Sequence, residues 1–397
     1  MTLPVNEIKI EIMWRHLVFF GLLYFVQGAA LAYVINFQKP YLHSQGISNE
    51  TIGLFTSLLL IPFIGKVVLG WVSDRLSLGR WGARKPYMLL GLLVFAVSYF
   101  SISFVEPGSH FTLFASLTWL ASLGLALFDT CADGWAVDVA RPEEQSSIQA
   151  AMVAGKSIGL LLMAFLFGRW VEGNGYSIVF LTLSIMALAV WILVLMMPHR
   201  DAPKTSSALI HQPKDLFQGF YLAFALFGIV YSIASFGTDG LLTLHLTDEH
   251  KMGVTDIGDF GVARGVGALV GAGVYAWLNR FASPRRLQFV ALGGLSLGCL
   301  LPLTGLDFLV SGLIWGLAWG FQETAYVTLA MRFSQGAFAA TFFAIAMIFS
   351  NLGTSLGEAF GAPMVTSIGY HGVFGVFSGI AALSMIFLPK ALSRIRG

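Results

Sequence analysis

Three aspartates lie in the last turns of one apolar stretch or directly after it. Asp129 and Asp133 fall within residues 113–137, and Asp138 follows them. A charged side chain at the centre of a membrane-spanning helix costs roughly 2.5–3.5 kcal/mol on insertion scales. Because Asp129 and Asp133 are four residues apart, both side chains share one helical face. The pattern indicates carboxylates that face an aqueous solute pathway rather than lipid.

Further ionisable side chains are expected at the same depth in other helices. At 1.5 Å per residue, Asp129, Lys66 and Glu323 lie about 12–13 Å from one end of their helices, and Lys156 about 15 Å. Those depths are close to the midplane of a hydrocarbon core about 30 Å thick. Each group alone is compatible with a structural ion pair, but four groups at one depth favour a central cavity.

The types of these residues suggest separate roles. Lys66 and Lys156 are candidate contacts for an anionic substrate, or counter-ions that keep the carboxylates ionised. Asp129, Asp133 and Glu323 are candidates for proton coupling, because burial in apolar surroundings favours the protonated form of a carboxylate.

Neutral and aromatic side chains complete the predicted site. Gln27 and Asn351 are candidate hydrogen-bonding groups, with contact between helices as the alternative. Arg264 is expected to form an ion pair or part of an outer gate. Four aromatic residues are candidate cavity lining, with packing as the alternative: Trp135, Tyr24, Tyr326 and Phe321. Three charged residues are expected to be solvated near the outer surface: Asp239, Arg169 and Glu358.

A second constellation stands in the connection after the second apolar stretch. Gly70, Asp74 and Arg75 are followed by Arg84. Glycine permits close approach of two helices, and the basic side chains can pair with an acid such as Asp138. The pattern predicts a gate at the cytoplasmic side, with an ordinary positive connection as the alternative.

Composition indicates an integral membrane protein that would hold these groups on helices. Of 397 residues, 56% are hydrophobic and 11% are charged, with a mean hydropathy of +0.77, whereas soluble domains average about 25% charged. The apolar runs are continuous, which favours helices over an alternating β-barrel pattern. The sequence therefore predicts an all-α membrane protein with twelve transmembrane helices, at residues 15–38, 50–73, 86–106, 112–138, 146–171, 176–198, 217–245, 256–279, 286–304, 307–331, 337–362 and 370–390.

The distribution of positive charge predicts the orientation. Most of the 23 Lys and Arg residues lie in connections on one side, and only Lys39, Arg169 and Lys251 lie in connections on the other. Both termini are therefore expected to be cytoplasmic. A polar connection divides the chain into a first six-helix half (1–198), a cytoplasmic linker (199–216) and a second half (217–397). Two halves around a midplane site are the expected layout of a secondary transporter.

These motifs resemble those of a known family. The segment from Gly70 to Arg84 is similar to the loop between helices two and three of the major facilitator superfamily. Within this superfamily, the sequence resembles the muropeptide permease and acetyl-coenzyme A transporter family. This resemblance rests on Asp129-x-x-x-Asp133-x-Trp135-x-x-Asp138 and on the region from Gly320 to Gly353. Single-subunit siderophore permeases are similar and equally compact. The resemblance implies the major facilitator fold and transport of an organic solute.

Other chemistry finds no support in the sequence. Gly155-Lys156-Ser157 lacks the glycine-rich loop that would cradle ATP phosphates. The eight His residues are scattered and Cys131 and Cys299 fall in predicted helices, so neither a metal site nor a disulfide framework is predicted. We expect no catalytic residue, cofactor or nucleic-acid partner, and therefore no enzyme.

The charged residues predict a monomeric, proton-coupled importer of an organic, anionic or amphipathic solute that works by alternating access, surrounded by lipid. The resemblance implies a location in the bacterial inner membrane and a substrate such as a muropeptide. The first alternative is a siderophore permease of the same superfamily. Acyl-coenzyme A or pteridine transport, an uncoupled facilitator and a channel remain open as further alternatives.

Overall fold

The computed structural model describes residues 5–76, 84–139, 145–197, 219–333 and 339–391, and every regular element in these ranges is a helix. The chain forms two compact units. Unit 1 contains residues 1–38 and 65–205, and unit 2 contains residues 39–64 and 206–397. This agrees with the predicted all-α class.

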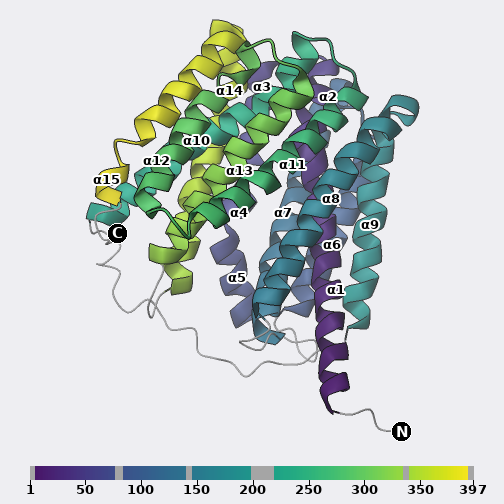
Figure 1. Cartoon of the computed structure of the whole chain (residues 1–397). Helices are drawn as coiled ribbons and strands as arrows, with labels where there is room; N and C mark the ends of the chain where they lie inside the picture. The colour runs from purple at the N-terminus through teal and green to yellow at the C-terminus, as the bar shows by residue number, and fades with distance from the viewer. Residues whose placement is uncertain (1–4, 77–83, 140–144, 198–218, 334–338, 392–397) are drawn as a thin grey trace. The chain divides into compact units, whose positions relative to one another are not determined.

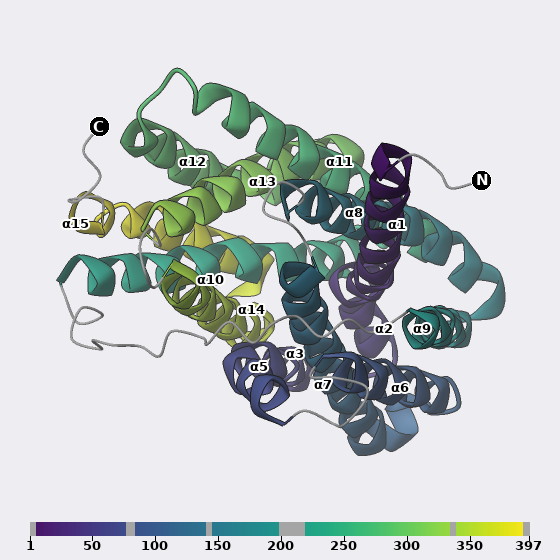
Figure 2. The ribbon, with the colours of Figure 1, turned by 90° about the horizontal axis from the view of Figure 1, so that it is seen from below.

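Unit 1 is a bundle of long helices (Figure 1). Helix α1 packs along α8, and α6 packs against both α7 and α9; the view from below in Figure 2 shows the same neighbours. The elements are α1 (Val5–Ala32), the π-helix η1 (Tyr33–Phe37), α5 (Lys66–Arg75), α6 (Lys85–Ile102), α7 (Pro107–Val139), α8 (Gln145–Asn174) and α9 (Ser177–Met196).

Helices α1 and α8 touch backbone to backbone. A Cβ atom added at Gly155 would overlap the carbonyl of Gly21, and one added at Gly28 would overlap the carbonyl of Lys156. Close approach of small residues is the usual way in which membrane helices gain packing, because lipid supplies no hydrophobic drive between them. These glycines fix the distance between the two helices that carry Gln27 and Lys156.

Unit 2 is built around two long helix pairs. Helix α10 packs along α14, α11 packs along α13, and the short α3 packs against α14. The elements are α2 (Gln38–Ser44), α3 (Asn49–Leu58), α4 (Ile61–Ile64), α10 (Gly219–Asp248), α11 (Val254–Leu278), α12 (Pro284–Gly298), the 3-10 turn η4 (Leu301–Leu303), α13 (Phe308–Phe333), α14 (Ala339–Ser384) and α15 (Leu388–Ala391).

Ten helical segments of the described residues are long and apolar enough to cross a membrane. One of them, Ile345–Lys390, covers the two helices predicted at 337–362 and 370–390. They are joined at Gly369, whose φ of 68° turns the chain, a conformation that suits glycine. Helix α13 matches the span predicted at 307–331 but is not among the ten. The count of twelve and the cytoplasmic termini stay predictions.

The second predicted span differs most from its expected form. Residues 50–73 were expected as one helix, but the structure divides them into α3, α4 and α5. Pro62 lies in α4, and proline removes a backbone hydrogen bond and bends a helix. Gly65 precedes α5, so Lys66 is the first residue of a new helix rather than the middle of a continuous one.

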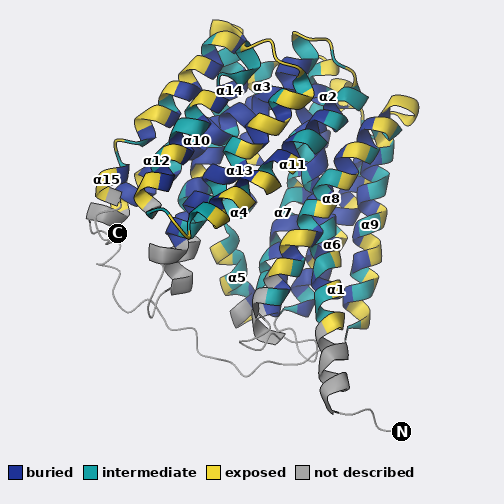
Figure 3. Ribbon diagram, in the orientation of Figure 1, coloured by how far each residue is buried: buried dark blue, intermediate teal, exposed yellow. Residues whose placement is uncertain are grey.

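Exposed side chains on the outer helices of each unit are largely apolar. Ile185 and Met196 on α9 are 65% and 77% exposed, and Val290 and Leu297 on α12 are 62% and 71% exposed. Figure 3 shows such exposed positions interleaved with buried ones along both helices. Apolar surface of this extent is typical of contact with lipid.

Glycine substitutions on α8 test the close helix contact. We expect Gly155→Ala to destabilise the protein by about 1–3 kcal/mol, because the new methyl group overlaps the α1 backbone. Gly173→Ala is the matched control on the same helix, since nothing lies within 4 Å of the added atom there. Thermal unfolding in detergent measures both, and equal melting temperatures would contradict the contact.

Candidate functional site

Unit 1 brings five of the predicted site residues into one polar cluster. They come from four helices: Gln27 from α1, Lys66 from α5, Asp129 and Asp133 from α7, and Lys156 from α8. The rise per residue of an α-helix predicted a common depth for most of them, and in unit 1 the structure shows that they are neighbours.

Asp129 is the centre of this cluster. Its side chain is buried, with 3% of the residue exposed. One carboxylate oxygen accepts a hydrogen bond from Gln27 Nε2 at 2.8 Å, and the other forms an ion pair with the Lys66 ammonium group. The side chain of Lys66 is 30% exposed, whereas that of Asp129 is 4% exposed. The lysine is therefore the less enclosed member of the pair.

Asp133 stands one helical turn from Asp129 on the same face of α7. Its carboxylate accepts a hydrogen bond from the Tyr24 hydroxyl of α1. Lys156 is close enough to interact electrostatically with both aspartates and with Lys66. The cluster thus holds two carboxylates and two ammonium groups, and its formal charge is zero when all four are ionised.

Trp135 packs rather than lines an opening. It is 4% exposed, and its ring lies edge-on against Phe19 and Phe20 of α1, with centroids 5.3 and 6.4 Å away. Its indole N–H has no hydrogen-bond partner in the part of the chain that the structure describes. The sequence analysis left packing open as the alternative role of Trp135, and these contacts agree with it.

Glu323 and Asn351 belong to unit 2. The side chains of Tyr231 and Ser235 lie close to Glu323, and one oxygen of its carboxylate has no hydrogen-bond partner among the described residues. Beside Asn351, it is Ser350 that makes hydrogen bonds, with Ser232 at 2.9 Å and Tyr231 at 3.4 Å. A layer that joins Glu323 to the unit 1 cluster stays a prediction.

A second buried ion pair lies in unit 2, and here one expectation was wrong. Asp239 was expected to be solvated but is 7% exposed. Its Oδ1 accepts hydrogen bonds from Arg264 Nη1 at 2.9 Å and from Trp315 Nε1 at 2.8 Å. The three residues join α10, α11 and α13, so the pairing role expected for Arg264 is confirmed. Its partner could not be read from the sequence.

The other two residues that were expected to be solvated differ in their surroundings. Arg169 is exposed, with its guanidinium group 3.5 Å from the centre of the Phe165 ring. Glu358 instead pairs with Lys39, and their side chains are 16% and 6% exposed. Solvation was therefore the wrong expectation for Glu358. An acid in the apolar sequence of α14 was the signal for a buried partner.

The predicted gate is described in part. Arg84 donates from Nη1 to the Ser73 hydroxyl at 3.0 Å, and its guanidinium group lies on Gly134 of α7, where a Cβ would overlap it. Gly70 of α5 faces Thr130 of α7. The side chains of Asp74, Arg75 and Asp138 lie outside the described residues. Arg84 is thus in contact with α7, and its pairing with Asp138 stays a prediction.

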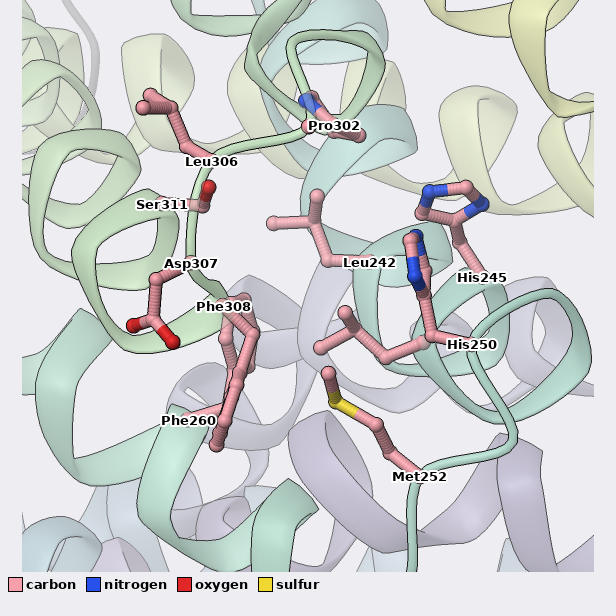
Figure 4. Close-up of a pocket in the computed structure, with 12 residues that line it drawn as sticks. Leu242, His245, His250, Met252, Phe260, Pro302, Leu306, Asp307, Phe308 and Ser311 are labelled. Carbon is pink, nitrogen blue, oxygen red and sulfur yellow. The ribbon is translucent and has the colours of Figure 1, made fainter.

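A cavity of about 220 Å³ lies at one end of unit 2, and no predicted substrate residue lines it. Figure 4 shows His245 and His250 side by side, with Met252, Phe260 and Phe308 on its apolar wall. Asp307 caps α13 there by accepting from two backbone N–H groups. No group of three His, Cys, Asp or Glu side chains in the described ranges could hold a metal ion.

Comparison with known proteins decides the family. The sequence profile of the Major Facilitator Superfamily matches residues 19–238, more than half of the chain. The chain belongs to the major facilitator superfamily. The anhydromuropeptide permease of Escherichia coli K12 is 26% identical over 384 residues, 92% of this chain and 77% of that protein. The predicted resemblance to muropeptide permeases is thereby confirmed.

Solved structures of the superfamily share the fold. The nucleoside transporter NupG superimposes with a TM-score of 0.75 at 13% identity, covering 94% of this chain and 99% of that chain. A D-xylose-proton symporter gives a TM-score of 0.73 at 15% identity, covering 96% and 97%. This major facilitator protein is therefore a multi-pass membrane transporter, and its relatives are transporters and permeases rather than enzymes.

A double-mutant cycle tests the ion pair between Lys66 and Asp129. Lys66→Gln should lower the free energy of unfolding by about 2–3 kcal/mol, because it leaves a buried carboxylate without its paired cation. The loss should be smaller than for a fully buried pair, because the Lys66 side chain is partly exposed. Asp129→Asn should also destabilise, and the double variant should lose less than the sum. Unfolding in detergent gives the four values, with the exposed Arg169→Gln as control. Additive losses would contradict the pair.

Proposed function

We propose that this major facilitator protein is a proton-coupled importer of an organic anionic solute of the muropeptide class in the bacterial inner membrane. The observation that carries the proposal is the cluster of Asp129, Asp133, Lys66 and Lys156, which is built on membrane-spanning helices and in which the Lys66 side chain is partly exposed. The name of the Escherichia coli relative supports the substrate class. The D-xylose-proton symporter supports the energy source.

The balance of charge in the cluster supplies a coupling mechanism. With both carboxylates ionised, the aspartates neutralise the two lysines. A proton added to either aspartate leaves the cluster with a net charge of +1 and weakens the hold on Lys66. The ammonium group of Lys66, which is then no longer paired with the carboxylate, can bind an anionic solute. Loss of the proton restores the internal pair and displaces the solute.

The neutral members of the cluster fit the remainder of such a substrate. Gln27 already donates to Asp129 and has an amide oxygen without a hydrogen-bond partner among the described residues. Tyr24 carries a hydroxyl next to Asp133. Sugar hydroxyls and peptide amides need such donors and acceptors, while the carboxylate of a peptide needs a lysine.

Asp129→Asn is the sharpest test of coupling. We expect it to abolish accumulation of anhydromuropeptide against its gradient in proteoliposomes with an imposed pH gradient, because the amide cannot exchange a proton. Exchange of labelled for unlabelled solute without a gradient should continue. Asp256→Asn, at the start of α11, should accumulate normally. Accumulation at the wild-type level by Asp129→Asn would overturn the coupling role.

A ligand panel tests the substrate class separately. An anhydromuropeptide at about 100 times its Kd should stabilise the purified protein by about 2.7 kcal/mol, since it binds only the folded state. Lys156→Gln should remove most of this stabilisation, and Arg169→Gln should keep it. Thermal shifts with a ferric siderophore, an acyl-coenzyme A and a pteridine distinguish the other classes. A shift with one of these and none with the muropeptide would reassign the substrate.

A further inference from the structure

Three exposed arginines lie in and next to the connection between α11 and α12 of unit 2. Arg280 follows the end of α11, and Arg285 and Arg286 stand in the first turn of α12. Neither the candidate transport site nor the predicted gate includes them. Within the described residues, none of the three guanidinium groups forms an ion pair. The connection therefore carries a concentration of positive charge that its surroundings leave without a counter-charge.

Acidic side chains are distant from these arginines along both helices. No Asp or Glu occurs between Asp259 and Asp307. Asp259 lies near the start of α11, so a rise of 1.5 Å per residue puts it about 30 Å from Arg280. Asp307 lines the same cavity as Phe260, which is also near the start of α11. The two nearest acids in the sequence are thus at the far end of the helix.

The connection stands at the end of two membrane spans. The apolar segments that could cross a membrane are Val254–Leu278 and Arg285–Leu303. Residues 279–284 join them, and they are therefore at the level where the hydrocarbon core ends and the lipid headgroups begin. The phosphate groups of phospholipids lie at this level, within reach of long basic side chains.

Two exposed aromatic side chains mark the same level. Trp277 and Phe281 are 59% and 74% exposed, and their rings meet edge-on with centroids 5.5 Å apart. Tryptophan is enriched where a membrane helix passes from hydrocarbon to headgroups. Phe281 follows Arg280 directly in the chain. The two rings therefore supply an apolar surface for acyl chains next to the positive charge.

A buried apolar cluster holds both ends of the connection in place. Tyr275 of α11 packs edge-on against Phe321 of α13, with ring centroids 5.2 Å apart. Leu287 of α12 belongs to the same cluster. Ser283 caps α12 by accepting a hydrogen bond from the backbone N–H of Arg286 at 3.5 Å. Because the end of α11 and the start of α12 are both fixed on α13, little backbone has to be ordered when a ligand binds.

We propose that residues 277–286 bind the headgroup of an anionic phospholipid. The three arginines bind the phosphate oxygens, since a guanidinium group can donate two parallel hydrogen bonds to a phosphate. The acyl chains of the lipid lie against the two aromatic rings. A zwitterionic lipid is a poorer ligand, because its ammonium group meets the same positive charge. This site is independent of the transported solute and of the proposed proton coupling.

Quenching by brominated lipid tests the site, with Trp277 as the reporter. The protein is reconstituted in phosphatidylcholine vesicles that contain a small fraction of phosphatidylglycerol brominated on its acyl chains, or the same fraction of brominated phosphatidylcholine. The quenching due to Trp277 is the difference between the wild-type protein and Trp277→Phe. It should show an enrichment of phosphatidylglycerol of about fivefold or more, because a single arginine near the membrane surface favours an anionic lipid by about that factor.

Charge variants supply the controls. The triple variant Arg280→Gln, Arg285→Gln, Arg286→Gln should abolish the enrichment, and raised salt should reduce it by screening. Arg169→Gln removes an exposed arginine of unit 1 and should keep the enrichment. An excess of inorganic phosphate should also leave it unchanged, since phosphate has no acyl chain. Equal quenching of the wild-type protein by the two brominated lipids would overturn the site, as would enrichment that survives in the triple variant. Loss of the enrichment in inorganic phosphate would reassign the arginines to soluble anions.

Discussion

A charge within a membrane-spanning helix must have a partner, and this constraint organises the interior of both units. Lys66 with Asp129 joins α5 to α7, Arg264 with Asp239 joins α11 to α10, and Lys39 with Glu358 joins α2 to α14. Since an isolated charge costs several kcal/mol in hydrocarbon, each pair keeps its helices in contact. Apolar residues then cover the surfaces that face outward.

The pairs differ in how completely they are satisfied. One oxygen of Asp239 accepts from both Arg264 and Trp315, and all three residues are buried, so the group suits a fixed support. The Asp129 cluster instead has a partly exposed Lys66 and a second acid one turn away. An arrangement with a second acid and a partly exposed lysine side chain is better suited to exchange protons or ligands than a fully enclosed pair. This difference, more than burial itself, separates the candidate site from the structural pair.

The sequence predicted the unit 1 cluster because helix geometry fixes depth along the chain. Asp129, Lys66 and Lys156 could be placed by counting residues from helix ends. Counting does not determine which helices are neighbours, so the partners of Asp239 and Glu358 remained hidden. The irregular backbone at residues 33–37 was missed for another reason. These residues are as apolar as their surroundings, and hydropathy does not distinguish a π-helix from a continuous span.

Close packing within the units explains why irregular backbone matters. Gly21 and Gly155 bring α1 and α8 into backbone contact, and Gly267 does the same for α11 against α13. Two helices in such contact cannot approach further without overlap of main-chain atoms. A change of conformation is more easily absorbed where the regular α-helix is already interrupted. The chain meets that condition at both places where it passes between the units, after residue 38 and before residue 65, and Lys66 stands directly at the second.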